Sequence, residues 1–490
     1  MSGSGNPSVL RIRNNRRLES LDPAFAFNQI ETALICALLP MLIETGTGTD
    51  EYIPLDTEYV EKLDSTHIRF RLKPDLRWSN GFGPVTAHDV KASYERVANP
   101  ANNSAYINDW AALDHVEVTD EREGTIVLKE PFTPLLSTTL PGPAGGIFPA
   151  AALRGRESRN FGVGIPATAG PYKIKHWDPG HSLIIERNVD WKGKRPTYDE
   201  VHLILIVDDK AAEIAYDAGE IDATRLSASS LAEFEKHPRP HSTITKHPLH
   251  AYYWLGMRVD HPLFQDIRVR RAIQQAINIE ELVEGTFLGS VQPATGIIAP
   301  GVTGYRQKQH LPAYDPKSSI ALLRQAGYPN GFETIITTIN ETELVAAATI
   351  VATQLREIGI TAEVAPEDAN SIFVRAQGPL EYRRDDQILL CQFGVSPDPY
   401  WYMVWFGPEQ IGKWNWERWN SKEFGELARQ GTLDDDPRKR QLIYERMADL
   451  MDQSGAYVFF ANGLNASIHR SNIPYKVRGY NPLQPAFRLI

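Results

Sequence analysis

The stretch AGPYKIKHWDPGHSLIIERNVDWKG, residues 169–193, decides the fold class of this chain. Apolar and polar residues alternate over 172–177 and again over 182–187, a pattern that is typical of half-buried strands. Between these runs, DPGH at 178–181 supplies the residues that favour a tight turn. The stretch therefore predicts a β-hairpin, entered through a turn at Gly170 where we expect a positive φ.

Strands and helices of similar length alternate along the rest of the chain. Further strands are predicted at 67–72, 125–130 and 201–207. Helices are predicted at 86–97, 210–219, 269–285, 318–327, 342–359 and 437–453. Thr86 is placed to cap the first of these helices, and glycines follow three helix ends where a left-handed residue is needed. Strands mixed with helices over the whole length predict an α/β fold.

Size and charge exclude several classes of protein. The chain has 490 residues, of which 42% are hydrophobic and 23% charged, as expected of a soluble globular protein of one to three domains. Its formal net charge of −10 argues against a nucleic-acid partner, which requires a basic surface. No segment approaches the roughly 18 apolar residues that a membrane helix needs.

Neither the first residues nor the cysteines and histidines indicate a targeting signal or a reactive site. MSGSGNPSVLR, residues 1–11, lacks a basic region followed by an apolar one, so we expect a cloning remnant before a mature chain. Cys36 and Cys391 lie in apolar stretches and predict buried free thiols. The histidines lack metal-ligand spacing, and no hydrolase, metalloprotease or P-loop signature occurs. We expect no metal, no cofactor and no enzymatic activity.

Six segments, in this order along the chain, resemble one known family. They are RFRLKPDLRWSNGFGPVTAHDVKASYERV (69–97), the hairpin stretch (169–193), FQDIRVRRAIQQAIN (264–278), YDPKSSIALLRQAGYPNGF (314–332), QLREIGITAEV (354–364) and DDDPRKRQLIYERMADLM (434–451). Together they resemble the family-5 extracellular solute-binding proteins, the oligopeptide-, dipeptide- and nickel-type receptors of ABC importers. The resemblance covers nearly the whole chain.

The resemblance implies a two-lobed periplasmic-binding-protein fold of type II, with two crossing strands as hinge and an extra subdomain in the larger lobe. By analogy, residues 1–40, 165–255 and 465–490 form lobe I, 41–164 form the extra subdomain, and 256–464 form lobe II. The resemblance also implies a monomer that is periplasmic or lipid-anchored. Such a receptor binds a small-molecule ligand and delivers it to the membrane permease of an ABC importer.

Polar residues in loops are the first candidates for ligand contacts. By analogy, the loop that holds Asn28 and Gln29 lines the cleft, and Thr168 lies at its lip. The amides of Asn28 and Gln29 suit hydroxyls or carboxylates, although capping of the next helix is an alternative role. Ser227 and Asn340 follow predicted strands, where ligands of open α/β sheets bind.

The segment AYYWLGMR, residues 251–258, resembles the first hinge strand. Relatives commonly carry Asn where this chain has Arg258, whose planar guanidinium suits a carboxylate or phosphate of a ligand. The alternative is an ion pair with Asp260 or Asp266. Because neighbours on a strand alternate, the three aromatic residues of the segment cannot all face the cleft, and we expect Tyr253 to do so.

The segment LLCQFGVSPDPYWYM, residues 389–403, departs from the peptide-binding pattern. Peptide-binding relatives carry an aspartate three residues before an Asp/Glu–Pro pair and use it to hold the free amine of the ligand. Here the pair begins at Asp398 and the matching residue is Val395. A buried ammonium without a counter-charge is costly. We therefore expect a polar solute, such as an opine, a sugar phosphate, an oligosaccharide or a modified amino acid, with a peptide as the alternative.

The segment WYMVWFGPEQIGKWNWERW, residues 401–419, holds five of the ten tryptophans. The resemblance places a Gly-x-Asn-like turn, here Gly412 to Asn415, against the ligand. We expect Trp414 to stack on the ligand and Asn415 to hydrogen-bond it. The indoles in the more regular flanks are expected to be core, namely Trp401, Trp405 and Trp419.

A regulator that senses a ligand inside the cell is the competing class, because such proteins also use this fold. They carry an N-terminal helix-turn-helix, whereas the solute-binding pattern here begins within the first twenty residues. We therefore favour the transport receptor.

Overall fold

The structure is a computed structural model. It describes residues 8–26, 28–45, 52–369, 371–372, 375, 386–396 and 398–473, apart from the side chains of Gln29 and Thr45. The chain divides into two compact units. Unit 1 comprises Met1–Leu226, Arg239–Thr245 and Ser467–Ile490, and unit 2 comprises Ser227–Pro238 and Lys246–Ala466. The boundaries predicted by analogy for the lobes and the extra subdomain stay a prediction.

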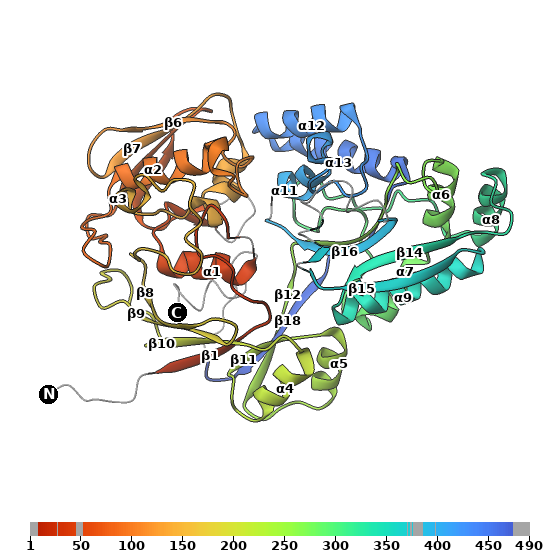
Figure 1. Ribbon diagram of the computed structural model, residues 1–490, viewed down its shortest axis with the longest axis horizontal. Coiled ribbons are helices and arrows are strands. Elements are labelled where there is room, and N and C mark those ends of the chain that lie inside the picture. Colours follow the sequence, from red (N-terminus) through yellow and green to blue (C-terminus); the bar gives the residue numbers. More distant parts are fainter. Residues whose placement is uncertain are drawn as a thin grey trace. The chain divides into compact units, whose positions relative to one another are not determined.

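A seven-stranded sheet organises unit 1 (Figure 1). The predicted hairpin is present as β8 and β9, and β9 also pairs antiparallel with β10. Strand β1 lies parallel to β10 on one side and to β11 on the other. In sheet order the strands are β12 (Ser242–Pro248), β18 (Leu464–Arg470), β11 (Ala223–Leu226), β1 (Val9–Asn14), β10 (Glu200–Leu205), β9 (Ser182–Arg187) and β8 (Tyr172–Asp178).

Two strands of this sheet, β12 and β18, run through the boundary between the units, at 245/246 and at 466/467. They are neighbours in the sheet. Within unit 1 the Thr245 hydroxyl lies 2.9 Å from His469 Nε2. Helices α1 (Gln29–Leu38) and α4 (Asp209–Asp217) belong to unit 1, whereas α5 (Ala228–Lys236) belongs to unit 2.

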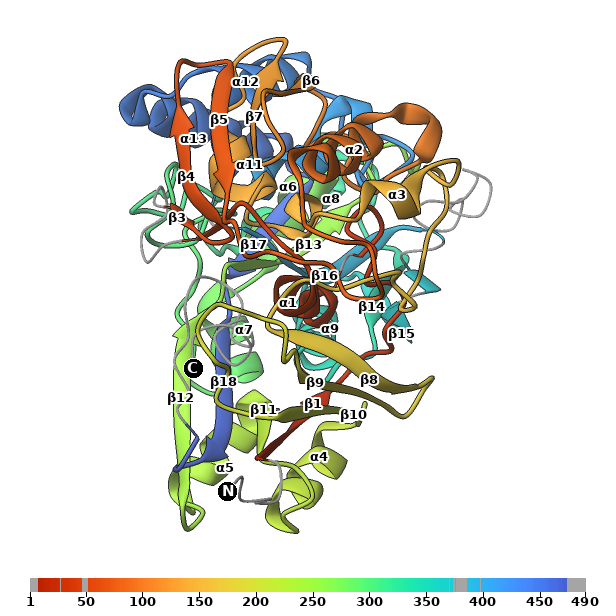
Figure 2. The same cartoon turned by 90° about the vertical axis from the view of Figure 1, so that its left-hand side faces the viewer.

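A smaller antiparallel sheet in unit 1 has the strand order β4-β5-β7-β6. Helix α2 (Ala87–Ala98) packs against β6, and α3 (Ala150–Leu153) packs against α2. Figure 2 shows these strands in red-orange to orange. Their bounds are β4 (Thr57–Lys62), β5 (His67–Leu72), β6 (Leu113–Val118) and β7 (Glu123–Leu128), and a separate pair is formed by β2 (Ile43–Thr45) and β3 (Tyr52–Pro54).

Unit 2 is built on a five-stranded mixed sheet. Strand β14 runs parallel to β15 and β16, whereas β13 runs antiparallel to β16 and β17. In sheet order the strands are β15 (Thr361–Glu367), β14 (Glu333–Ile339), β16 (Ile388–Gly394), β13 (Ala251–Met257) and β17 (Tyr457–Ala461).

Helices cover both faces of this second sheet. Helices α7 and α9 lie on one side, and α11, α12 and α13 lie on the other (Figures 1 and 2). The bounds are α6 (Ile267–Ala276), α7 (Ile279–Phe287), α8 (Pro316–Gln325), α9 (Thr342–Glu357), α11 (Pro399–Met403), α12 (Lys422–Leu433) and α13 (Pro437–Ser454). The predicted α/β class is confirmed by both units.

Helix ends fall where local chemistry places them. The backbone N–H of Thr86, the N-cap of α2, donates to Asp89 Oδ2 at 2.7 Å, which satisfies a donor of the first turn. The predicted left-handed glycines are confirmed, with φ of +77° at Gly219, +95° at Gly327 and +88° at Gly359. Cys36 and Cys391 are buried and form no disulfide, as predicted.

Two local predictions are wrong. The helix predicted over 269–285 is two helices, because the Asn278 side chain accepts from the Glu281 N–H at 3.2 Å and starts α7 afresh. Gly170 does not have a positive φ. A glycine is needed there because a Cβ would lie 2.3 Å from the carbonyl oxygen of Ala37. No helix among the described residues is long and apolar enough to cross a membrane.

Candidate solute-binding site

Four partly exposed aromatic side chains gather at the carboxyl end of β16. We call them the aromatic platform: Phe393, Trp401, Trp405 and Trp414. The Trp405 ring centroid lies 5.2 Å from that of Trp401, 5.6 Å from that of Trp414 and 5.7 Å from that of Phe393. These separations are those of edge and tilted aromatic contacts, so the four rings form one rigid surface.

Three short elements bring the platform together. Phe393 is the penultimate residue of β16, where its ring lies 6.4 Å from that of Tyr252 on β13. Helix α11 carries Trp401, and the 3-10 turn that follows it carries Trp405. Trp414 comes from a turn that Gly412 opens with a φ of +87°. Residues 21 positions apart in the chain therefore share one surface at the end of the sheet.

Asn415 stabilises the loop that carries Trp414. Its amide nitrogen donates to the carbonyl oxygens of Phe406 at 2.9 Å, Gly407 at 3.2 Å and Trp419 at 2.8 Å. The residue is completely buried. Its N–H groups hold the loop that presents Trp414, and the ligand contact expected of Asn415 stays a prediction.

The other tryptophans of the segment pack inward. Trp401, Trp405 and Trp419 contact the hydrophobic core of unit 2, as predicted, and so does Trp416. Trp401 and Trp405 still leave part of their surface exposed, so they belong to the core and to the platform at once. Trp414 meets Phe393, Trp405 and Trp416. Its ligand role stays a prediction.

Neither Val395 nor Asp398 presents an unpaired charge at the carboxyl end of β16. Val395 is 4% exposed, and its N–H donates to the His250 carbonyl at 2.8 Å. The carboxylate of Asp398 is 2.9 and 3.0 Å from Arg440 Nη2 and also accepts from the Tyr400 N–H at 2.9 Å. Burial alone would lower the pKa of Arg440, but the Asp398 carboxylate raises it overall. Asp398 thus forms a buried ion pair within unit 2, and its role as a ligand contact stays a prediction.

Arg258 lies far from the platform. Its N–H donates to the Gln387 carbonyl at 3.0 Å, whereas His250 pairs with Val395 at the other end of the same two strands. Eight residues at about 3.3 Å each separate these ends by about 26 Å. The predicted alternative is present, since Arg258 Nε lies 2.7 Å from Asp260 Oδ1. Arg258 does not belong to the platform, and its ligand role stays a prediction.

The remaining candidates in unit 2 are Asn340, Tyr253 and Ser227, and they lie in three different places. Asn340 is exposed just past β14, at the same edge of the sheet as the platform, and its N–H donates to the Glu367 carbonyl at 2.8 Å. Tyr253 is 5% exposed and packs on Phe287 of α7, on the opposite face of the sheet. Ser227 is buried as the N-cap of α5. Only Asn340 is thus brought near the platform.

Unit 1 uses its candidates for local structure. Asn28 caps α1, with its Oδ1 accepting from the Glu31 N–H at 2.8 Å, which is the alternative role expected for it. The side chain of Gln29 lies outside the described residues. Thr168 is 5% exposed, and its N–H donates to Ser79 Oγ at 3.0 Å. Their ligand roles stay predictions.

Sequence reasoning missed Phe393, Trp401 and Trp405 as surface residues. The spacing of Trp401 and Trp405 by four was a usable signal, because residues four apart share one side of a helical turn. Within the described ranges, no group of three or more His, Cys, Asp or Glu residues is placed to hold a metal ion.

Comparison with known proteins defines the class. The family model of the bacterial extracellular solute-binding proteins, family 5, matches residues 53–414. The chain belongs to this family, whose members are solute-binding receptors. The mixed α/β architecture is the family's periplasmic-binding-protein fold.

Individual relatives differ in what they bind. The glutathione-binding protein GsiB of Escherichia coli is 24% identical over 430 residues, which are 86% of this chain and 82% of that protein. The periplasmic binding protein DppA of Helicobacter pylori, in complex with the peptide STSA, has a TM-score of 0.86 at 21% identity, covering 97% of this chain and 96% of that one. MoaA of A. tumefaciens R10, in complex with mannopinic acid, has a TM-score of 0.87 at 21% identity and covers 98% of each chain.

Proposed function

We propose that this chain is the receptor of an ABC importer and that it delivers a short peptide or a peptide-like amino-acid derivative to a membrane permease. The aromatic platform at the carboxyl end of β16 is the observation that carries the proposal. It is a preformed, partly exposed surface of four rings at the edge where ligands of open α/β sheets bind. Aromatic rings at such a surface can cover peptide planes and apolar side chains without a charged anchor.

Peptide-like solutes are favoured over sugar phosphates and oligosaccharides by the relatives. GsiB is named for glutathione, a tripeptide, and DppA holds the peptide STSA. The sequence had favoured a non-peptide solute because Val395 cannot neutralise an amine. Val395 is indeed in the core. We reconcile the two observations by proposing a peptide-like ligand whose amine is not held at this position.

An opine is the second candidate. MoaA binds mannopinic acid, and the apolar residue at 395 suits a ligand without a free primary amine at that point. Opines and peptides share carboxylates and an amino-acid core, so both fit a receptor built on aromatic contacts and a few polar groups.

Thermal unfolding with a ligand panel tests the proposal. Protein that has been unfolded, dialysed and refolded to remove bound solute would be mixed with glutathione, a dialanine–trialanine series or mannopinic acid. We expect at least one peptide-like compound to raise the melting temperature, because ligand at 100 times its Kd adds about 2.7 kcal/mol to folding stability. A response to mannopinic acid alone would replace the peptide by an opine. A response only to sugar phosphates would contradict the proposal.

A further inference from the structure

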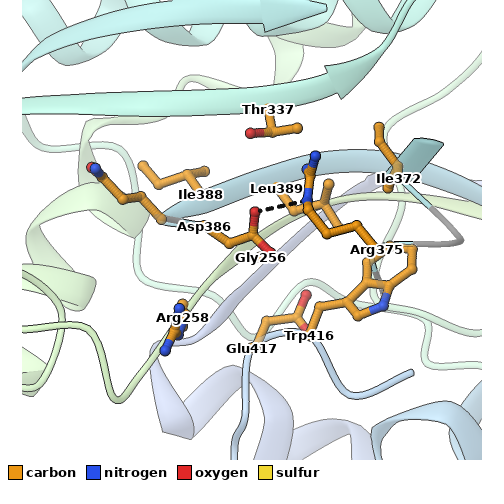
Figure 3. A pocket seen from close by; sticks show the side chains of 11 residues that line it. Gly256, Arg258, Thr337, Ile372, Arg375, Asp386, Ile388, Leu389, Trp416 and Glu417 are labelled. Atoms are coloured by element: carbon orange, nitrogen blue, oxygen red, sulfur yellow. Dashed lines mark ion pairs between the residues drawn. The ribbon is translucent and has the colours of Figure 1, made fainter. Parts of the chain in front are cut away.

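A hollow in unit 2 lies where β13 ends and β16 begins. Its volume is about 410 Å³, including space open to solvent. Thr337 of β14, Leu389 of β16 and Gly256 of β13 form one row of its floor, since they are paired neighbours across the three strands. Trp416 and Glu417 also line it, and none of the four platform residues does (Figure 3).

Glu417 places a buried carboxylate in this hollow. The residue is 2% exposed, and its Oε1 accepts a hydrogen bond from Trp254 Nε1 at 2.8 Å. Its Oε2 is buried and has no hydrogen-bond partner in the part of the chain that the structure describes. Figure 3 shows the carboxylate beside the Trp416 indole, among the lining residues. A buried acceptor without a partner is costly, and such a group calls for an explanation.

Among the described residues, the charges around the hollow are paired with one another and not with Glu417. Arg258 lies 2.7 Å from Asp260 Oδ1, and Arg375 Nε lies 3.3 Å from Asp386 Oδ1. Each guanidinium therefore has its own carboxylate, whereas no ion pair joins Glu417 to any described residue. Burial raises the pKa of Glu417 to about 7, although the Trp254 hydrogen bond acts against the rise. A cationic group bound in the hollow would compensate the negative charge of the Glu417 carboxylate.

The backbone leaves room for this carboxylate. A Cβ at Gly256 would lie 1.9 Å from Glu417 Oε1, so the strand approaches the carboxylate in a way that only glycine permits. Trp254, two residues earlier on β13, holds Oε1 and stacks on Trp416 with ring centroids 6.1 Å apart and planes 21° apart. Glu417 is thus held in one orientation by a rigid frame, as in a preformed site.

We propose that the hollow binds a small organic amine, whose primary ammonium donates to Glu417 Oε2 and whose carbon skeleton lies against Trp416 and Leu389. An ammonium supplies the missing positive charge and the missing hydrogen-bond donor together. The adjacent indole adds cation–π attraction. A metal ion fits less well, because it needs several oxygen ligands and no acidic or histidine cluster of the described chain provides them.

The test uses n-butylamine hydrochloride as probe and the indole N–H resonance of Trp254 as readout, in phosphate buffer because Tris is itself a primary amine. Trp254 donates to Glu417, so its resonance reports on the carboxylate. We expect a saturable shift with n-butylamine that weakens at least tenfold in Glu417→Gln. Glu423→Gln, at an exposed glutamate of α12, should leave the response unchanged.

Neutral and N–H-free probes separate the proposal from simple filling of a cavity. n-Butanol has the same chain without the charge, and tetramethylammonium has the charge without N–H donors. Both should bind more weakly than n-butylamine. Equal shifts with n-butanol, an unchanged response in Glu417→Gln, or no saturable shift in the unsubstituted protein would overturn the proposal. The comparison of probes on the unsubstituted protein still decides if Glu417→Gln fails to fold. Peptide binding at the platform does not depend on this outcome.

Discussion

Substitution of Trp414 is the most direct test of whether the platform binds the ligand. Its ring contacts three other aromatic side chains, and it is partly exposed. An aromatic contact of this kind contributes about 0.5–1.5 kcal/mol beyond burial of its area. We expect Trp414→Ala to weaken ligand binding by about tenfold in calorimetric titration.

The control for Trp414 is another tryptophan. Trp177 on β8 is 38% exposed, and Trp177→Ala should leave affinity unchanged. Equal effects of the two substitutions would mean that tryptophan loss acts through stability, and that the platform does not bind the ligand.

Glu417 predicts a pH dependence of stability. Its folded pKa of about 7 lies above the ordinary 4.5, so the folded protein holds a proton that the unfolded chain has lost. Stability therefore falls as pH rises from about 4.5 to above 7, by about 3 kcal/mol for this group. Between pH 5 and pH 8, urea unfolding in phosphate should show a fall in the free energy of unfolding that is smaller by about 2.5 kcal/mol in Glu417→Gln than in the unsubstituted protein.

The comparison with Glu417→Gln isolates one group. Burial also raises the pKa of Asp109 in unit 1, to about 8, but that residue is present in both proteins and its effect cancels. Parallel pH profiles of the two proteins would show that Glu417 is not the group that titrates.

Among the elements, α11 and α13 are joined by a buried ion pair. Arg440 of α13 meets Asp398 at the start of α11, and both side chains are at most 5% exposed. Removing one partner leaves an uncompensated buried charge, which typically costs about 3–5 kcal/mol. Arg440→Met should reduce the free energy of unfolding by that amount in urea titration.

A surface pair serves as the matched control for Arg440. Arg446 on the same helix lies 2.8 Å from Glu423, and its side chain is 43% exposed. Arg446→Met should cost less than about 1 kcal/mol, as exposed pairs do. Similar losses for the two arginines would contradict a structural role for the Asp398–Arg440 pair.

Elements with local signals were predicted well from the sequence. Strand β5 and the hairpin strand β9 were placed at the observed bounds, because alternation and turn residues are short-range signals. The start of α7 at Asn278 was missed. The helical spacing of apolar residues continues through this cap residue and therefore predicts one uninterrupted helix. Gly170 was placed correctly for the wrong reason, since its close approach to Ala37 depends on packing that no local pattern reveals.

The site was predicted less well than the elements. Asp398 and Asn415 are polar residues that the sequence offered as ligand contacts. Asp398 pairs with Arg440 of a distant helix, and Asn415 donates to carbonyl oxygens of its own segment. Trp401 and Trp405 were expected in the core alone, although they also reach the surface. Whether a polar group meets a ligand or a neighbouring element depends on tertiary contacts, which one sequence does not display.

At the scale of the whole molecule, function rests on binding and release of a solute. The family's members are solute-binding receptors, and the two units are joined by neighbouring strands, β12 and β18. Six collinear segments were enough to indicate this family. The identity of the solute depends on a few side chains and stays a proposal.

Identification of the natural solute is the most direct test of the proposed function. The chain would be purified without unfolding and then denatured, and the released small molecules would be analysed by mass spectrometry. We expect a short peptide or a peptide-like amino-acid derivative in stoichiometric amount, and a smaller amount of it from a Trp414→Ala preparation. A stoichiometric sugar phosphate or oligosaccharide would contradict it.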